Sequence, residues 1–410
     1  MKHIIVGKGP AGVVAAETLR ALDPTGDILL LGDEPEPAYS RMAIPYLLTG
    51  KIGEQGTRLR AADDHFQRLG IETRAGRVTA VDGAGRRLTL EDGQTLEWDR
   101  LLVATGASPV KPPIPGLELP GVHHCWTLED ARRIMARARP GARVVLLGAG
   151  FVGCIIMEAL VARGVALTVV EAGDRMVPRM MDEVAGKLIQ QWCVAKGIEV
   201  RTSTRLVEVE AQGEGLRLHC DCGQPLEADL LVVAAGVQPN TGFLEGSGVR
   251  IERGIVTDAH QQSSVEGLFA AGDVCESVRW GGGRGVHAIQ PMAVETGRVA
   301  AMNMAGRQAT HVGSLDMNIL DTLGLIAASY GRWQGVEGGD TASVLDRRAN
   351  RYLKLQFDGE RLIGAITLGL TEHLGALRGL IQSRRPLGVW KSRLMADPAR
   401  FMEAWVDTLT

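Results

Sequence analysis

The sequence predicts an α/β fold made of two similar strand–turn–helix units, followed by a small α+β domain. A short apolar run at 3–6 leads into glycines 7, 9 and 12 and then into an apolar, alanine-containing run. The same plan returns with the apolar run 143–147, glycines 148, 150 and 153, and a helical run to Ala162. From about Ser314 the pattern changes to strand-like alternation followed by helical segments.

Length and composition limit the class of protein. A chain of 410 residues with 45% hydrophobic residues fits two or three packed domains at roughly 150 residues each. The formal net charge of −3 lacks the excess of positive charge that is typical of nucleic-acid-binding proteins. No apolar run reaches the roughly 18 residues that a membrane span needs. Six cysteines are too few for a disulfide scaffold, so we expect a cytoplasmic protein.

Each glycine-rich loop has the surroundings that a dinucleotide site requires. It follows a buried strand, opens a helix, and is followed by a second apolar run, at 27–31 or 166–170, that leads to an acid. The first glycine makes the tight turn, the second admits a pyrophosphate, and the third lets helix and strand pack closely. The helix N-terminus then faces the phosphates. The two units are therefore predicted to be Rossmann-like dinucleotide-binding domains, most simply for a flavin fed by a nicotinamide.

The remaining elements are expected from alternation and turn residues. Asp92-Gly93 is predicted to close a hairpin, and the five prolines between 109 and 120 indicate a linker. Further strands are expected at 77–81, 87–90, 207–218, 226–233, 352–357 and 362–366.

Three further motifs resemble those of a known protein family. Residues 102–109 contain ATGASP, residues 234–240 read AAGVQPN, and residues 267–274 read GLFAAGDV. With the two loops, they resemble the pyridine nucleotide–disulfide oxidoreductase superfamily over residues 1 to about 305. The resemblance implies a glutathione reductase-like fold. It implies an FAD-binding domain at 1–112 and 241–310, an NAD-binding domain at 113–240, and an α+β interface domain at 311–410.

The resemblance also implies cofactor-binding residues. Glu34, with Asp33 as the competing choice, would hold the adenosine ribose of FAD, Val78 would touch the adenine, and Asp273 would accept a hydrogen bond from the ribityl chain. The segment 289–297 resembles the helix whose positive end faces the isoalloxazine. The full FAD set is Gly7, Gly9, Pro10, Ala11, Gly12, Asp33, Glu34, Arg41, Val78, Ala104, Thr105, Gly106, Gly272, Asp273, Pro291 and Met292. The NAD set is Gly148, Gly150, Phe151, Val152, Gly153, Glu158, Glu171 and Gly236.

Some features of the second unit depart from the family or leave alternatives open. Glu171 favours NAD over NADP, because an acid there binds ribose hydroxyls and repels a 2′-phosphate. Arg175 and Arg179 could pair with such a phosphate but are expected to be solvated loop residues. The family usually has Glu where this chain has Ile155. Glu158, about one helical turn on, could replace it or could be a surface acid.

The expected chemistry uses no thiol. No cysteine lies in 12–22 or 39–46, where family members carry redox cysteines, and no cysteine pattern indicates a metal site. Hydride transfer between stacked rings needs orientation more than acid–base help, so no catalytic residue is nominated. Cys220 and Cys222 are expected to be surface thiols.

The segment Tyr39-Ser40-Arg41 resembles the branch that contains NADH:rubredoxin reductases, ferredoxin-type reductases and the flavin domain of NADH-nitrite reductases. The resemblance implies an FAD-dependent NAD(H) oxidoreductase that exchanges electrons with an iron–sulfur or rubredoxin-type protein. That partner could be a subunit of a larger complex of the phenylglyoxylate dehydrogenase kind. An NADH oxidase or a flavin-binding structural subunit is the alternative.

Two C-terminal stretches, 384–391 and 401–405, combine tryptophan with charged residues. They suit an oligomer or heteromer interface, unless the tryptophans pack in the core of the small domain.

Overall fold

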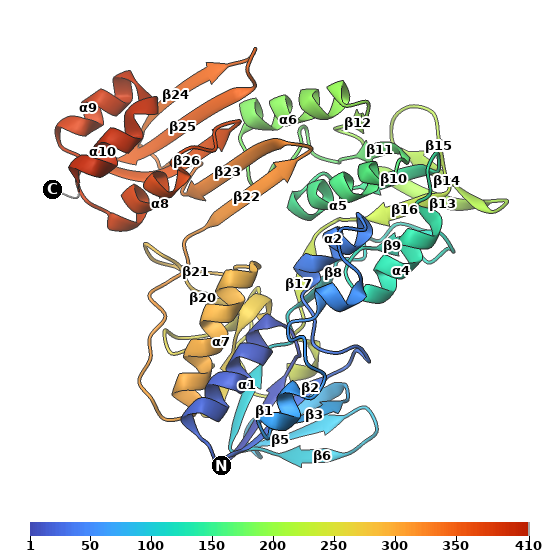
Figure 1. The fold of residues 1–410 in the computed structure, drawn as a ribbon, viewed down its shortest axis with the longest axis vertical. Helices are drawn as coiled ribbons and strands as arrows, with labels where there is room; N and C mark the ends of the chain where they lie inside the picture. The colour runs from blue at the N-terminus through green and yellow to red at the C-terminus, as the bar shows by residue number, and fades with distance from the viewer. Residues whose placement is uncertain (409–410) are drawn as a thin grey trace. The chain divides into compact units, whose positions relative to one another are not determined.

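The computed structural model describes residues 1–408, and the chain divides into two compact units (Figure 1). The first unit combines residues 1–110 with 237–314, and the second combines 111–236 with the chain from 315 onward. Each unit is therefore assembled from two separate stretches of sequence. The predicted three-way division, with its cofactor assignments, stays a prediction.

The first unit is built on a parallel five-stranded sheet in the order β19-β7-β1-β2-β3. Because side chains alternate across a strand, Ile5 packs beneath the helices while Ile4 and Val6 pack toward the antiparallel sheet β4-β5-β6. Helices α1 and α7 lie side by side, and a Cβ on Gly297 would come within 2.5 Å of the Ala11 carbonyl oxygen. The main elements are β1 (Lys2–Val6), α1 (Pro10–Leu22), β2 (Asp27–Gly32), β3 (Glu72–Ala75), β4 (Val78–Asp82), β5 (Arg87–Leu90), β6 (Thr95–Glu97), β7 (Arg100–Val103), β19 (Leu268–Ala270) and α7 (Gln290–Met304).

Smaller elements complete this unit. Strand β8 (Ala107–Pro109) pairs with β17 (Val237–Pro239), where the chain leaves the unit and returns to it. The others are α2 (Ile44–Leu48), α3 (His65–Arg68), β18 (Ile255–Val256), β20 (Cys275–Val278), β21 (Arg284–Gly285) and the 3₁₀ turns η1 (Arg41–Ala43), η2 (Glu54–Thr57), η3 (Gly242–Leu244) and η4 (Gly272–Val274).

The second unit repeats the plan with the parallel sheet β12-β11-β10-β16-β9, next to a small antiparallel sheet β13-β14-β15. Strand β16 is buried along its whole length and β10 from Val144 to Leu147, as expected for a parallel sheet covered on both faces. The elements are β9 (Val122–His124), α4 (Leu128–Arg137), β10 (Arg143–Leu147), α5 (Phe151–Ala162), β11 (Ala166–Val170), α6 (Glu183–Ala195), β12 (Glu199–Arg201), β13 (Leu206–Gln212), β14 (Gly215–Cys220), β15 (Leu226–Ala228) and β16 (Leu230–Val233).

The C-terminal part of the same unit is an antiparallel sheet in the order β22-β23-β26-β25-β24 with three helices. Helix α5 packs against β22, and the indole N–H of Trp192 donates to the Thr322 carbonyl oxygen at 3.1 Å. The elements are β22 (Met317–Thr322), β23 (Leu325–Gly331), β24 (Asp340–Asp346), β25 (Arg351–Asp358), β26 (Arg361–Leu368), α8 (Leu374–Ser383), α9 (Val389–Ala396), α10 (Phe401–Asp407) and the 3₁₀ turn η5 (Pro398–Arg400).

The C-terminal tryptophans pack within this domain. Trp390 is only 7% exposed, and the Arg393 guanidinium carbon lies 4.7 Å from its ring centroid. The Trp405 ring lies against Gly379 on α8, where a Cβ would come within 2.5 Å of it. Core packing, the alternative to an exposed interface, therefore describes Trp390.

No helix among residues 1–408 is both long enough and apolar enough to cross a membrane.

Candidate dinucleotide sites

The first glycine of each loop holds a turn that other residues cannot make. Gly7 has φ of +120° and Gly148 has φ of +102°, both in the region that favours glycine. A Cβ on Gly7 would lie 2.1 Å from the Ala104 carbonyl oxygen, and one on Gly148 would lie 2.5 Å from that of Ala234. Each loop is thus pressed against the segment that follows the neighbouring strand.

The third glycine of each loop lets the helix approach the turn. A Cβ on Gly12 would come within 1.9 Å of the Gly7 carbonyl oxygen, and one on Gly153 within 2.1 Å of that of Gly148. Both contacts are to backbone, which cannot move aside as a side chain can. The close packing of helix on strand therefore requires these glycines.

The second glycine of each loop opens onto free space. A Cβ on Gly9 or Gly150 would meet nothing within 4 Å. Each of these residues precedes the first turn of a helix, α1 or α5, and no side chain caps that turn. The first N–H groups of the helix are therefore available to an anion, as pyrophosphate binding requires.

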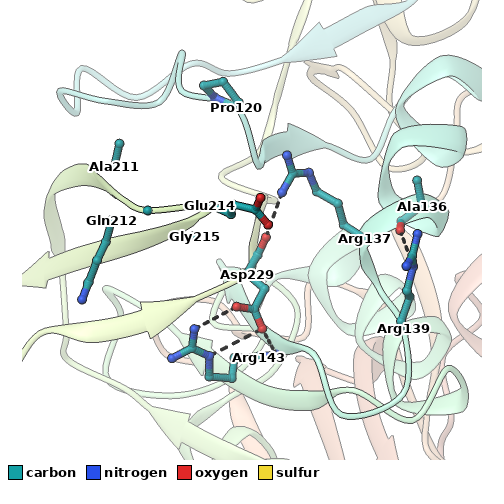
Figure 2. Close-up of a pocket in the computed structure, with 11 residues that line it drawn as sticks. Pro120, Ala136, Arg137, Arg139, Arg143, Ala211, Gln212, Glu214, Gly215 and Asp229 are labelled. Atoms are coloured by element: carbon teal, nitrogen blue, oxygen red, sulfur yellow. Dashed lines mark hydrogen bonds and ion pairs between the residues drawn. The ribbon is translucent and has the colours of Figure 1, made fainter.

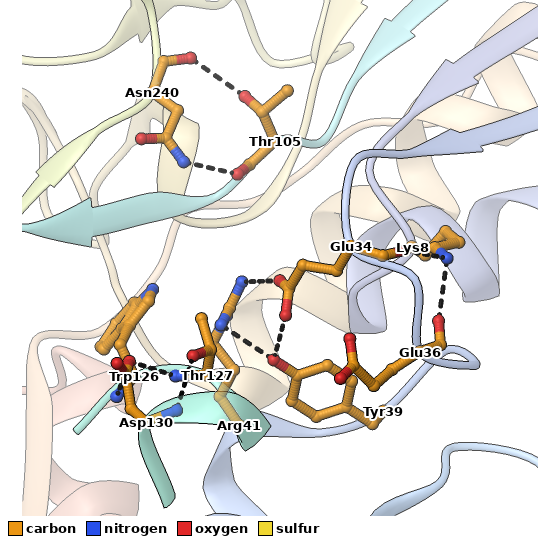
Figure 3. Close-up of polar contacts among 10 residues, drawn as sticks. All are labelled: Lys8, Glu34, Glu36, Tyr39, Arg41, Thr105, Trp126, Thr127, Asp130 and Asn240. Carbon is orange, nitrogen blue, oxygen red and sulfur yellow. Dashed lines mark hydrogen bonds and ion pairs between the residues drawn. The ribbon is translucent and has the colours of Figure 1, made fainter. Parts of the chain in front are cut away.

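The acid after β2 forms a cluster with the Tyr-Ser-Arg segment (Figure 3). The Tyr39 hydroxyl donates to Glu34 Oε2 at 2.5 Å, and the Arg41 guanidinium donates to Oε1 at 2.6 Å. Lys8, in the glycine-rich loop, donates to the carbonyl oxygens of Glu34 and Glu36, both at 2.9 Å. A carboxylate has about four lone-pair sites, so Glu34 can still accept from a ribose hydroxyl. Asp33, the competing choice, is exposed.

Asp273 is an acceptor that the described residues leave unused. It lies in η4 beside Gly272, whose N–H donates to Thr296 Oγ1 at 3.0 Å. Burial raises the pKa of Asp273 to about 6, against the opposing effect of Arg41. Among residues 1–408, no hydrogen bond reaches its carboxylate. A ligand hydroxyl would supply the missing donor.

Thr105, another predicted FAD residue, follows the carboxyl end of β7, which neighbours β1 in the first sheet. Thr105 and Asn240 form a reciprocal pair (Figure 3): the Thr105 hydroxyl donates to the Asn240 carbonyl oxygen at 3.0 Å, and Asn240 Nδ2 donates back to the Thr105 carbonyl oxygen at 2.9 Å. Ser40 donates to Gln290 Oε1 at 2.6 Å and so fixes the segment before η1 to the start of α7. The side chain of Val78, in contrast, is buried in the core.

The second unit places Glu171 against its own glycine-rich loop. Oε2 accepts the Ala149 N–H at 2.7 Å, and Oε1 accepts the Gly173 N–H at 2.7 Å. Glu158 is half-buried on α5. Gly236 has φ of +109°, and an added Cβ there would lie 3.9 Å from the guanidinium of Arg179. From the sequence, Arg179 is expected to be a solvated loop residue, with pairing to a 2′-phosphate as the alternative, and nothing in the local pattern indicates its proximity to Gly236.

A hollow of about 870 Å³ lies elsewhere in the second unit (Figure 2). Arg143 and Asp229 stand at or before the first residues of β10 and β16, so the hollow borders the amino ends of the strands. Arg143 is paired with Asp229 at 2.8 Å and Glu227 at 2.6 Å. Dinucleotides bind at the carboxyl ends of such sheets, so this hollow is separate from the candidate site.

The cysteines are poorly suited to redox chemistry. All six are free thiols, and only Cys222 is exposed. Burial raises the pKa of Cys125, Cys193 and Cys275 to about 12 in each case, and it raises the pKa of Cys154 as well. A thiol that stays protonated is a poor nucleophile. Residues 1–408 also contain no group of three or more His, Cys, Asp or Glu side chains placed to hold a metal ion.

The residues fit the two cofactors that the motifs imply. Two open glycine positions face uncapped helix starts, and a partly buried carboxylate lacks a donor. These are the groups that a pyrophosphate and a polyol chain need.

Comparisons with known proteins agree. Residues 1–309 match the family model of the pyridine nucleotide-disulphide oxidoreductases. The chain is 34% identical over 402 residues to the NADH-dependent phenylglyoxylate dehydrogenase subunit epsilon of Aromatoleum evansii, covering 97% of this chain and 95% of that one. It is 33% identical over 287 residues to the biphenyl dioxygenase system ferredoxin–NAD(+) reductase component of Paraburkholderia xenovorans (strain LB400), covering 68% of this chain and 69% of that one.

The fold matches that of the covalent putidaredoxin reductase–putidaredoxin complex with a TM-score of 0.90 and 23% identity, over 99% of this chain and 98% of that one. The predicted fold class and family resemblance are confirmed, and the family implies binding of FAD and NAD(H). The chain belongs to the pyridine nucleotide–disulphide oxidoreductase family, in which it is an NAD(P)H-dependent flavin oxidoreductase of the ferredoxin reductase type without a redox disulfide.

Proposed function

We propose that this protein carries electrons between NAD(H) and a one-electron iron–sulfur or rubredoxin-type protein by way of FAD. The supporting observation is that one chain holds two glycine-rich loops of matching geometry while its buried thiols stay protonated. Without thiol chemistry, electrons that reach the flavin need an acceptor outside the chain.

The first unit is the proposed FAD site. The N–H groups of Ala11 and Gly12 bind the pyrophosphate, since Pro10 has no N–H, while Glu34 accepts from the adenosine ribose and Asp273 accepts from the ribityl chain. FAD supplies the step between two-electron exchange with a nicotinamide and one-electron exchange with a metal centre. The positive end of α7, tied to Ser40 through Gln290, stabilises negative charge at the ring.

The second unit is the proposed NAD(H) site. The N–H groups that follow Gly150 bind the pyrophosphate, and Glu171 accepts from the ribose and disfavours a 2′-phosphate, so NADH is the proposed substrate. The protein's contribution to the rate is to place two rings at a productive separation, which can supply several kcal/mol of the barrier reduction. No side chain has to transfer a proton in that step.

The proposed partner follows from the names of the relatives. One is a subunit of a dehydrogenase and another is a ferredoxin–NAD(+) reductase component. We propose that this chain likewise serves an iron–sulfur protein, either as a subunit of a larger complex or through transient contact. The cytoplasmic location expected from the low cysteine content remains part of this proposal.

The test uses the purified flavin-loaded chain with NADH under anaerobic conditions. We expect NADH to bleach the flavin absorbance and the reduced protein to reduce an added ferredoxin or rubredoxin. When the reduced protein is mixed with oxygen in a stopped-flow instrument, the flavin should be reoxidised more slowly than by the ferredoxin or rubredoxin. Rapid turnover with oxygen and none with either carrier would instead identify an NADH oxidase. A flavin that NADH does not bleach would indicate a structural subunit.

A further inference from the structure

The loop 171–182, between β11 and α6, forms hydrogen bonds with the middle residue of the second glycine-rich loop, Ala149. Glu171 accepts the Ala149 N–H at 2.7 Å, and the Val177 N–H donates to the Ala149 carbonyl oxygen at 2.8 Å. Ala149 stands between the glycine that makes the turn and the glycine that opens onto free space. The position of these peptide groups is therefore set from outside the glycine-rich loop itself.

The loop 171–182 has a strained backbone at Val177, where it contacts Ala149. Val177 has φ of +46°, a conformation that a β-branched residue rarely adopts, and its side chain is 1% exposed. Such a conformation persists only where the surrounding structure determines it. The N–H groups of Met180 and Met181 both donate to the Val177 carbonyl oxygen at 2.9 Å, which carries the constraint toward the end of the loop.

That end is held by the C-terminal sheet. Asp182 Oδ1 accepts the Ala185 N–H at 3.0 Å and so caps α6, which uses one of its two oxygens. Oδ2 accepts the Tyr352 hydroxyl at 2.8 Å and Lys354 Nζ at 3.2 Å. Tyr352 and Lys354 are two residues apart on β25, so both project from the same face. Burial and the Asp182 carboxylate raise the pKa of Tyr352, so its hydroxyl remains a donor.

We propose that Tyr352 and Lys354 are positioning residues for the nicotinamide nucleotide. Acting through Asp182, they fix the loop 171–182 and with it the Ala149 peptide groups against which the dinucleotide binds. The inference rests on the proposed function, because it takes the second glycine-rich loop as the NAD(H) site. If Tyr352 and Lys354 have this role, the C-terminal sheet contributes to the nucleotide site and is also a candidate surface for partners.

The test measures nucleotide binding and turnover in the full-length, flavin-loaded chain. The variants are Tyr352→Phe, Lys354→Met and the double variant. We expect the double variant to raise the Kd for NAD⁺, measured by calorimetry, and the KM for NADH, measured with ferricyanide, each about fivefold or more. The kcat and the FAD content should stay near their original values. Lys354→Arg, which keeps a charged donor, should restore most of the affinity.

Lys391→Met is the matched control. It removes a lysine–aspartate pair of 2.6 Å, between Lys391 on α9 and Asp340 on β24 of the same sheet. We expect its Kd for NAD⁺ to equal that of the original protein. An unchanged Kd in the double variant, or an equal rise in Lys391→Met, would overturn the positioning role.

Two further results separate the possible failures. Should the double variant not fold, Tyr352→Phe decides the question, because it removes one hydroxyl and no packing volume. If the original protein does not bind NAD⁺ at all, the proposed function fails together with this inference. If it binds NAD⁺ and the variants bind equally well, only the positioning role is lost.

Discussion

Gly9 and Gly7 are two residues apart in one loop but have different structural roles. Gly9 has ordinary backbone angles and open space where a Cβ would stand, whereas Gly7 has positive φ and a carbonyl oxygen 2.1 Å from that position. The first glycine therefore serves the fold, and the second keeps room for a ligand. The order of the glycines in the motif predicts these two roles, and the structure supplies the distances that distinguish them.

The two glycines should respond differently to alanine. Gly9→Ala should change the free energy of unfolding by less than about 1 kcal/mol yet weaken FAD binding at least about tenfold, because the methyl group occupies the pyrophosphate position. Gly7→Ala should cost about 3 kcal/mol or more. Thermal melting and the flavin content of purified protein measure the two effects. Gly150→Ala, as the control, should keep its FAD and raise the KM for NADH. A Gly9→Ala protein with full flavin content would contradict the assignment.

The raised pKa of Asp273 predicts a pH dependence. Since its folded pKa of about 6 lies above the ordinary value of 3.8, protonation favours the folded chain. Without FAD, the contribution of Asp273 to the free energy of unfolding should therefore fall as the pH rises from about 4 to about 6, so the difference in stability between the original protein and Asp273→Asn should change over this range. An ionised carboxylate accepts a stronger hydrogen bond, so FAD affinity should rise about fivefold through pH 6. Fluorescence titrations at pH 5 and pH 7.5 measure this rise, and an equal rise in Asp273→Asn would exclude Asp273 as its source.

The thiols should be dispensable. Cys222 is exposed, whereas burial keeps Cys125, Cys193 and Cys275 protonated. N-ethylmaleimide at pH 7 should therefore label Cys222 first and leave NADH turnover with ferricyanide unchanged. Mass spectrometry identifies the labelled site, and Cys222→Ser provides the unlabelled control. Loss of turnover in step with labelling would show that a thiol takes part.

At the scale of elements, the sequence predicted the features that depend on neighbouring residues, such as the limits of buried strands and the position of a hairpin turn. The strands Arg143–Leu147 and Ala166–Val170 begin and end where the apolar runs do, and Gly93 adopts φ of +83° in the predicted hairpin turn. The run 226–233, expected as one strand region, is divided at Asp229 between two different sheets. Which strands pair is decided by distant partners, and the apolar pattern of a single strand does not contain that information.

The residues of the candidate sites divide in the same way. The loop glycines could be found from spacing, because the turn and the helix start are local. The contacts of Glu171 with Ala149, of Ser40 with Gln290, and of Asp182 with β25 join residues 22, 250 and at least 170 positions apart. No periodicity or short motif carries such pairs. The strained Val177 is hidden for a similar reason, since valine usually signals extended backbone.

Helix α7 offers a test of the proposed flavin position. Gln290→Glu keeps an oxygen that accepts from Ser40 but adds a negative charge at the positive end of the helix. A charge at a helix end is worth about 0.3–1 kcal/mol, so the two-electron midpoint potential of the flavin should fall by roughly 6–20 mV. Spectroelectrochemical titration measures the shift. Gln290→Met, which is uncharged but lacks the acceptor, separates loss of the hydrogen bond from the charge. A potential that Gln290→Glu leaves unmoved would place the flavin away from this helix.

At the scale of the whole molecule, the sequence located the two dinucleotide-type units and the change of pattern near residue 314. It did not reveal that the C-terminal sheet packs with residues 111–236 in one compact unit. That grouping depends on contacts such as Trp192 with Thr322 and Asp182 with Tyr352, which form only after both parts have folded. The C-terminal sheet therefore holds the end of the loop 171–182 in place through Asp182.

The interleaved chain has a consequence for synthesis in the cell. Each unit needs a stretch that the ribosome makes only after part of the other unit has emerged: the first is incomplete before residue 314, and the second before the last strands of the C-terminal sheet. The nascent polypeptide must therefore expose unfinished parallel sheets for much of translation, when they are prone to aggregate. Pulse-labelled nascent chains arrested near residue 236 should be digested by protease, whereas chains released at full length should resist.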